Sequence, residues 1–273
     1  MALRAPSRNT VGVAIDSAET LIGIHEETES DIAQRTAPRT PARKLVLWDL
    51  DYTLLDPAGF GHSSIDLAFK RLFSEDAPTD ISFAGRTDRA ILGDLIRKGA
   101  PGQEARQDEL QELVAALVEQ RNENLVEHGG RALPGALRAL ERLSTEGGII
   151  QSVLSGNLRR IGRIKVDSIG ASAYLDLDVA AFGDHHEIRA DLVRIAVAAA
   201  EAKYGHVFGG QDIVLIGDTP LDIEAALNAG ANAIGVANGG FSVAELAAAG
   251  ATVALPDLLD SEAILASVLG THR

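Results

Sequence analysis

An apolar run leads directly into two carboxylates in the stretch Lys44-Leu45-Val46-Leu47-Trp48-Asp49-Leu50-Asp51-Tyr52-Thr53. A continuous apolar run of this length is typical of a strand buried on both faces, as in a parallel sheet. Ligands of such sheets bind beyond the carboxyl ends of the strands, so Asp49 and Asp51 are expected at a functional edge. Their like charges repel, and a divalent cation is the simplest way to offset that cost. Taken alone, the motif also fits a solvated acidic loop.

Further apolar runs follow, most of them separated by helical patterns. The sequence predicts strands over 149–154, 177–182, 213–216, 233–236 and 252–255, and helices over 136–143, 191–203 and 221–229. Strands that alternate with helices indicate βαβ units. The expected fold class is therefore α/β, with a doubly wound parallel sheet.

The long segment between the first two predicted strands is the exception, because its pattern is almost wholly helical. Amphipathic stretches begin near Ile65 and Leu110, with apolar residues at helical spacing. An insertion of this size predicts a small domain of its own. We expect a core domain at 44–58 and 132–273, a helical cap domain at 59–131, and a flexible N-terminal extension at 1–43.

The composition narrows the classes of partner. There are 39 Asp and Glu against 25 Lys and Arg, giving a formal net charge of −14. Such acidity argues against nucleic acid as a partner, because phosphates require a basic face. The chain has no cysteine, which excludes thiolate nucleophiles and cysteine metal sites and fits a cytoplasmic location. No segment has the pattern of a secretory signal or a membrane span, so no membrane partner is expected.

A second acidic turn follows the predicted strand at 213–216, in the sequence Gly217-Asp218-Thr219-Pro220-Leu221-Asp222. Asp218 and Asp222 are four residues apart, so a turn that opens a helix can aim both at one point. Thr219 could equally be the N-cap of that helix, with Pro220 in its first position. The two interpretations are compatible.

Two further signals concern phosphate. Ser155-Gly156-Asn157 ends a predicted strand and can offer a hydroxyl and backbone N–H groups to an anion, although such sequences are also common in turns. Arg189 begins a predicted helix and is the candidate cation for a bound phosphate. Lys165 lies mid-helix and is expected to be a surface or packing residue.

Together these motifs resemble the haloacid dehalogenase (HAD) superfamily, most strongly its phosphoglycolate phosphatase-like branch. The resemblance covers residues 44 to 256 and rests on Asp-x-Asp-x-Thr, then Ser, then Arg, then Gly-Asp-x-x-x-Asp, each near the end of a strand or the start of the next helix. It implies a Rossmann-like core, with the helical insertion as a cap domain.

The resemblance also implies roles for individual residues. Asp49 would be the nucleophile that forms an aspartyl-phosphate, and Asp51 would protonate the leaving oxygen and later activate water. The implied Mg²⁺ ligands are Asp49, the backbone carbonyl of Asp51, Asp218 and, through water, Asp222. The implied phosphate-binding residues are Ser155, Gly156, Asn157 and Arg189; Ser155 and Arg189 are also counted with the candidate catalytic residues.

The expected activity is Mg²⁺-dependent hydrolysis of a small phosphate monoester. Dehalogenating relatives lack the second acidic residue, so Asp51 favours phosphoryl transfer. A phosphosugar mutase and a non-catalytic phosphate-binding protein remain alternatives. Tyr52 departs from the family pattern, where Gly or Asn is usual, and could alter the turn or partly fill the entrance to the site. The pattern identifies neither the substrate nor the oligomeric state.

Overall fold

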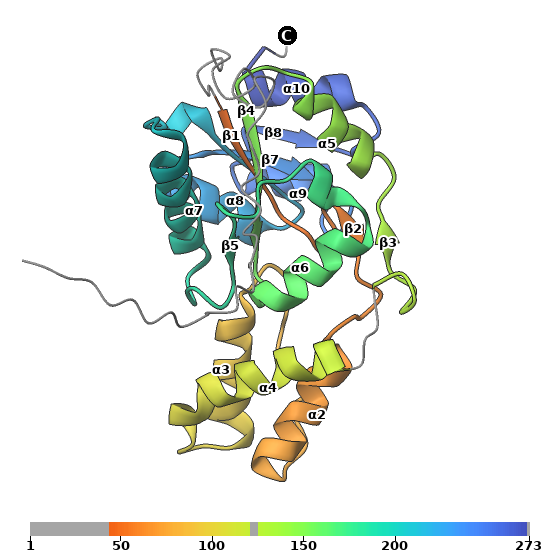
Figure 1. Ribbon diagram of the computed structural model, residues 1–273, viewed down its shortest axis with the longest axis vertical. Helices are drawn as coiled ribbons and strands as arrows, with labels where there is room; N and C mark the ends of the chain where they lie inside the picture. Colours follow the sequence, from red (N-terminus) through yellow and green to blue (C-terminus); the bar gives the residue numbers. More distant parts are fainter. Residues whose placement is uncertain (1–43, 121–124, 272–273) are drawn as a thin grey trace, which may run out of the picture. The chain divides into compact units, whose positions relative to one another are not determined.

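A six-stranded parallel sheet forms the centre of the protein (Figure 1). The computed structural model describes residues 44–120 and 125–271. The strands are β1 (Lys44–Trp48), β4 (Ile149–Ser155), β5 (Ala181–Phe182), β6 (Ile213–Gly217), β7 (Asn232–Val236) and β8 (Val253–Leu255). Their order across the sheet is β5-β4-β1-β6-β7-β8, so successive strands spread in opposite directions from β1. The predicted doubly wound α/β fold is confirmed, and its topological switch point lies at β1.

Strand β1 is the central element because it pairs on both sides. Leu45 lies opposite Ile150 of β4 and Ile213 of β6, and both pairings are parallel. Residues 45–48 are completely buried, as expected for a strand covered on both faces.

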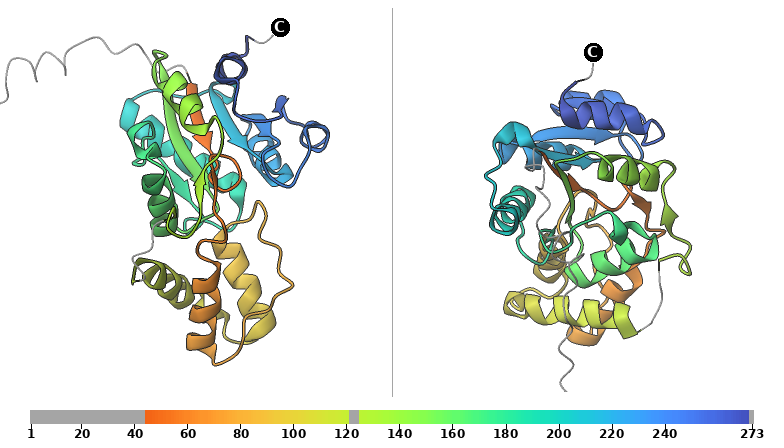
Figure 2. Two further views of the ribbon diagram at one scale, coloured as in Figure 1. Left: turned by 90° about the vertical axis from the view of Figure 1, so that its right-hand side faces the viewer. Right: turned by 45° about the horizontal axis from the view of Figure 1, so that its top comes forward.

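Alternate residues of β1 face two different hydrophobic layers. Val46 and Trp48 join the layer that includes α5 (Ala136–Ser144), α6 (Arg159–Ser168) and α10 (Ser261–Leu269). Leu45 and Leu47 join the layer that includes α7 (Arg189–Tyr204), α8 (Pro220–Asn228) and α9 (Val243–Ala248). The two turned views in Figure 2 show these helices on either side of the sheet. Short 3₁₀ helices lie at Glu104–Arg106, Ala171–Ala173 and Gly210–Asp212.

The segment between β1 and β4 is helical, as predicted. It contains α2 (His62–Phe73), α3 (Asp88–Gly99) and α4 (Gln107–Gln120), which lie together beyond the ends of the strands in Figure 1. Their buried apolar faces include Phe69, Leu92 and Leu110. A short antiparallel pair, β2 (Leu55–Asp56) with β3 (Arg131–Ala132), lies where the chain leaves and re-enters the sheet domain. We call the segment between these two strands the insertion; its boundaries as a domain at 59–131 stay a prediction.

Some predictions need correction or cannot be assessed. The predicted strand at 177–182 is shorter, because only Ala181 and Phe182 pair with β4. The predicted extension at 1–43 lies outside the described residues. Among the helices of the described ranges, none combines the length and the apolar character needed to cross a membrane.

Candidate active site

The loop after β1 is tied to the sheet by backbone hydrogen bonds. The N–H of Asp49 donates to the carbonyl of Ile216 in β6 at 2.9 Å. The N–H groups of Leu54 and Leu55 both donate to the carbonyl of Leu50, which closes a tight turn around Asp51. Asp49 is therefore held at the end of the central strand, with its side chain buried.

Tyr52 adopts a left-handed backbone conformation in this turn. Its φ angle is 61°, a region that bulky residues seldom occupy. The usual Gly or Asn of the family tolerates this geometry, which gives a physical reason for the family pattern. The ring of Tyr52 is half-exposed and lines the cavity described below. The turn is thus preserved despite the bulky residue, but the backbone of Tyr52 is strained.

The second acidic turn is shaped by the start of α8. Thr219 is the N-cap, and its side chain accepts a hydrogen bond from the N–H of Asp222 at 3.2 Å. Oδ2 of Asp222 accepts in return from the hydroxyl and the N–H of Thr219. A side chain at Gly217 would collide with the Asp222 carboxylate, so glycine is needed there. The capping interpretation is confirmed, and it leaves Oδ1 of Asp222 for the site.

Asp49, Asp218 and Asp222 form a buried acidic cluster. One carboxylate oxygen from each residue lies within 4.8 Å of the others. This spacing would allow all three carboxylates to bind one metal ion. Burial, followed by repulsion from Asp222, raises the pKa of Asp49, although Arg189 opposes the shift. Burial and repulsion from Asp49 likewise raise the pKa of Asp218. A divalent cation would reverse both effects, and hard oxygen ligands of this kind fit Mg²⁺.

Arg189 lies against this cluster as the first residue of α7. Its Nη2 atom is 2.5 Å from Oδ1 of Asp49 and 2.7 Å from Oδ1 of Asp222. The contact with Asp222 is close in distance but lacks hydrogen-bond geometry, since that oxygen has no hydrogen-bond partner among the described residues. Nε of Arg189 is also buried without a partner there. The guanidinium therefore lies inside the site with hydrogen-bonding capacity unused.

The loop after β4 presents the predicted anion-binding groups. The hydroxyl of Ser155 is buried and accepts a hydrogen bond from the N–H of Asn157 at 3.2 Å. Nδ2 of Asn157 donates to Oδ2 of Asp51 at 3.1 Å, while its Oδ1 is buried without a partner among the described residues. Ser155, Gly156 and Asn157 thus lie next to the carboxylates.

A turn of the insertion docks onto these loops through main-chain atoms. We call residues Gly85 to Asp88 the docking turn. The N–H of Asp88 donates to the carbonyl of Gly156 at 2.6 Å, and Oδ2 of Asp88 accepts from the N–H of Leu158 at 2.8 Å. A side chain on Gly156 would collide with the carbonyl oxygen of Arg86. The insertion and the loop after β4, the predicted phosphate loop, therefore touch backbone to backbone.

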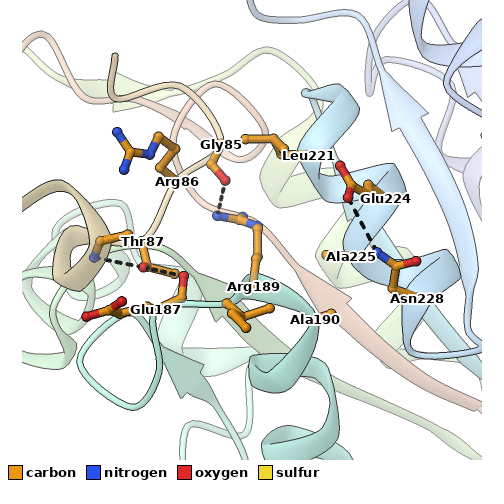
Figure 3. A pocket seen from close by; sticks show the side chains of 12 residues that line it. Gly85, Arg86, Thr87, Glu187, Arg189, Ala190, Leu221, Glu224, Ala225 and Asn228 are labelled. Carbon is orange, nitrogen blue, oxygen red and sulfur yellow. Dashed lines mark hydrogen bonds between the residues drawn. The ribbon is translucent and has the colours of Figure 1, made fainter. Parts of the chain in front are cut away.

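A small pocket of about 190 Å³ lies between the docking turn, α7 and α8. Figure 3 shows the residues that line it, including those of the turn. Nη1 of Arg189 points at the carbonyl of Gly85, at 3.4 Å. The hydroxyl of Thr87 donates to the carbonyl of Glu187 at 2.9 Å and accepts from Ala90 as the N-cap of α3. The guanidinium of Arg86 points away and pairs with Asp94. The docking turn of the insertion thus contacts the segments after two strands, β4 and β5.

A single cavity of about 720 Å³ connects these features. Its lining includes all eight residues predicted for the site: Asp49, Asp51, Ser155, Gly156, Asn157, Arg189, Asp218 and Asp222. Insertion residues such as Ile65, Phe83 and Ile91 line the same cavity. The volume is sufficient for a small organic ligand.

Sequence reasoning missed three residues of this region. Lys165 was expected at the surface or in packing, but its buried ammonium lies 2.7 Å from both carboxylate oxygens of Asp51. The sequence analysis gave no role to Asp88, whose carboxylate accepts from the N–H of Leu158. It also gave none to Gly239, where a side chain would collide with Asp218. The signal for Lys165 was its helical spacing from buried Ile161, which places both on one face.

The fold is that of an α/β protein with a polar cavity at the carboxyl ends of its strands, and comparison with known proteins identifies the family. The model for haloacid dehalogenase-like hydrolases matches residues 46–227. This chain belongs to that family, and the expected resemblance is confirmed. No curated protein matches the sequence.

Solved structures share the fold at low sequence identity. A hydrolase from Pseudomonas syringae is 22% identical with a TM-score of 0.56, covering 82% of this chain and 98% of its own. CbbY from Rhodobacter sphaeroides, solved with phosphate, is 20% identical with a TM-score of 0.59, covering 80% and 95%. A Bacteroides vulgatus protein assigned to the β-phosphoglucomutases is 17% identical with a TM-score of 0.59, covering 88% and 94%. The family match makes the protein an enzyme of the haloacid dehalogenase-like hydrolase type.

Proposed function

We propose that this protein is a Mg²⁺-dependent phosphatase that hydrolyses a small phosphate monoester through an aspartyl-phosphate. The observation that supports this most strongly is the shared cavity, which brings both carboxylates of the first motif together with the phosphate loop, Arg189 and the acidic cluster. Retention of Asp51 beside Asp49 favours phosphoryl transfer to water over dehalogenation.

The proposed chemistry divides between the two carboxylates after β1. Asp49 attacks phosphorus, the bond to the leaving oxygen breaks, and Asp51 gives that oxygen a proton. Asp51 then takes a proton from the water that hydrolyses the aspartyl-phosphate, which regenerates Asp49 and releases inorganic phosphate. Ser155, the amide of Gly156 and Asn157 bind the phosphate oxygens, and Arg189 neutralises charge on the transferred group.

Asp49, Asp218, Asp222 and the backbone carbonyl of Asp51 would hold Mg²⁺, which supplies positive charge for the phosphate oxygens. The raised pKa values of Asp49 and Asp218 support this assignment, because burial and mutual repulsion leave the cluster short of positive charge. Arg189 supplies part of that charge through its ion pair with Asp49.

We also propose that the insertion acts as a cap. It lines the cavity opposite the carboxylates and contacts the phosphate loop through the docking turn. A closed cap excludes water and selects the group that carries the phosphate. A small phosphorylated metabolite suits the cavity, and CbbY, which shares the fold, was solved with xylulose-(1,5)bisphosphate in a variant form.

A phosphosugar mutase is the second candidate. Mutases of the family keep both carboxylates, and one protein with the same fold is assigned to the β-phosphoglucomutases. A mutase would convert isomers and release little phosphate, whereas a phosphatase releases phosphate in proportion to product.

The deciding experiment measures phosphate release from a panel of phosphomonoesters, with Mg²⁺ and with EDTA, using Asp49→Asn as the blank. We expect metal-dependent release that is absent from Asp49→Asn. Full activity in that variant would overturn the mechanism, and equal phosphate release in EDTA and in Mg²⁺ would overturn the proposed metal dependence. Isomerised product without phosphate would establish the mutase instead.

A further inference from the structure

Lys165 is a buried cation that the family-based assignment of roles leaves unused. It lies on α6, on the face that also buries Ile161 and Val166. Its side chain is only 3% exposed. An ammonium in such surroundings is costly unless it is paired, so its partner decides what it does.

The partner is Asp51, the proposed acid and base. Nζ of Lys165 lies 2.7 Å from Oδ1 and 2.7 Å from Oδ2, so it faces the carboxylate symmetrically. Asn157 donates to Oδ2 at 3.1 Å from a second direction. Two groups from one loop–helix unit thus fix both the position and the rotation of the Asp51 carboxylate.

The carboxylate is held but not enclosed. The Asp51 side chain keeps 27% of its surface exposed, and Asp51 and Lys165 both line the large cavity. Arg189, a second buried cation that lines this cavity, is engaged with Asp49 and Asp222. Each carboxylate of the first motif therefore has its own buried cation, from a different helix.

We propose that Lys165 is a positioning residue that holds Asp51 in the orientation needed to reach the leaving oxygen. The inference rests on the proposed function, because it assumes the acid role of Asp51. A buried ion pair gives little net stability compared with a well-packed apolar pair, so stability alone does not explain a lysine here. A displaced catalytic group can cost on the order of 100-fold in rate.

The test compares substrates that differ in their need for an acid. Lys165→Met removes the charge and keeps the length of the side chain. We expect kcat/KM to fall about 100-fold for an alkyl phosphate, whose leaving oxygen needs a proton, and less than about tenfold for p-nitrophenyl phosphate, whose leaving group departs unprotonated. A purely structural role would lower both values alike.

Lys203→Met is the matched control, because it also removes a lysine paired with aspartates, Asp176 and Asp178, away from the cavity. It should leave kcat/KM for both substrates unchanged. Urea unfolding of Lys165→Met, Asp51→Asn and the double variant checks the fold. The double variant leaves neither charge unpaired, so its midpoint should shift by less than the sum of the single shifts.

The outcomes separate the two proposals. Equal losses for both substrates, no loss at all, or additive midpoint shifts would overturn the role of Lys165 while leaving an active wild-type phosphatase. A wild-type protein that releases no phosphate from either substrate would overturn the proposed function, and the role of Lys165 with it.

Discussion

Nη2 of Arg189 lies 2.5 Å from Oδ1 of Asp49, so the proposed nucleophile forms an ion pair with a buried guanidinium. The same nitrogen lies 2.7 Å from Asp222, and both partners are buried. One guanidinium therefore compensates the charges of two carboxylates. Without it, these buried groups would repel each other with no water to screen the repulsion. Arg189 therefore has a structural role in the acidic cluster, in addition to any role with phosphate.

Arg189→Met should destabilise the metal-free protein by about 3 kcal/mol, because it leaves a buried acidic cluster without its cation. Mg²⁺ should restore part of this loss, since it places positive charge in the same cluster. The measurement is urea unfolding with EDTA and with Mg²⁺. Arg194→Met, which removes a more exposed arginine of the same helix, is the control and should differ little from wild type in either condition. Equal stability of Arg189→Met and wild type in EDTA would contradict the prediction.

Mg²⁺ should bind more tightly as the pH rises from 6 to 8. Burial and mutual repulsion raise the pKa values of Asp49 and Asp218, so binding of the cation must displace protons at lower pH. The rise in Tm with Mg²⁺ concentration, measured at several pH values, reports this affinity. Asp218→Asn should weaken the response throughout. An affinity that is constant across the range would show that the cluster is already fully ionised without metal.

The free energy of unfolding of Asp88→Asn, measured relative to that of wild type, should increase as the pH rises from 4 to 7. Burial raises the pKa of Asp88 from 3.8 to about 6, against the hydrogen bond from Leu158. The folded protein thus holds this proton more tightly than the unfolded chain. The resulting stabilisation is complete below about pH 4 and is lost as the pH rises through about 6.

Asparagine keeps an acceptor for Leu158 but has no charge to bury. The difference between variant and wild type should therefore grow by up to about 3 kcal/mol across this range. Urea unfolding at each pH is the measurement. Asp80→Asn is the control of opposite sign, because a hydrogen bond from Lys98 lowers the pKa of Asp80. A flat difference for Asp88→Asn would show that its carboxyl is not desolvated.

Tyr52→Asn should stabilise the protein by about 1 kcal/mol, because asparagine tolerates the left-handed conformation that strains tyrosine. Tyr52→Ala removes the same ring but keeps the strain. Comparing the two variants therefore separates the effect of backbone strain from the effect of losing the ring. Both variants should open the cavity wall and lower KM for bulkier phosphate esters. Denaturant unfolding and steady-state kinetics are the two measurements. Equal stability of the Asn and Ala variants would show that the turn stores no strain.

Much of the architecture could be predicted because it depends on local patterns. The apolar run of β1 is buried on both faces, and Thr219 caps α8 as its sequence predicts. The acidic residues follow strand ends, and strand ends of a parallel sheet meet at one edge. Their convergence therefore follows from topology, without knowledge of any side-chain packing.

The missed features depend on packing between distant segments. Lys165 reaches Asp51 across 114 positions of sequence, and only the rotation of α6 against β1 decides whether it faces solvent or the site. The apolar run at 177–182 predicted a strand, and its residues Leu177 and Val179 are indeed buried. Burial of a side chain, however, does not require its backbone to pair with another strand. At this edge of the sheet only Ala181 and Phe182 find partners on β4.

The docking turn has a consequence for engineering. Gly156 and Gly183 leave no space for a side chain where the turn and the loops approach each other, so this junction is made of main-chain surfaces that must match in shape. A chimaera that borrows the insertion of another family member should therefore take residues 85–88 together with the loops around 156 and 183. Grafts cut between these segments would join mismatched surfaces, whereas substitutions confined to side chains that line the cavity leave this main-chain junction intact.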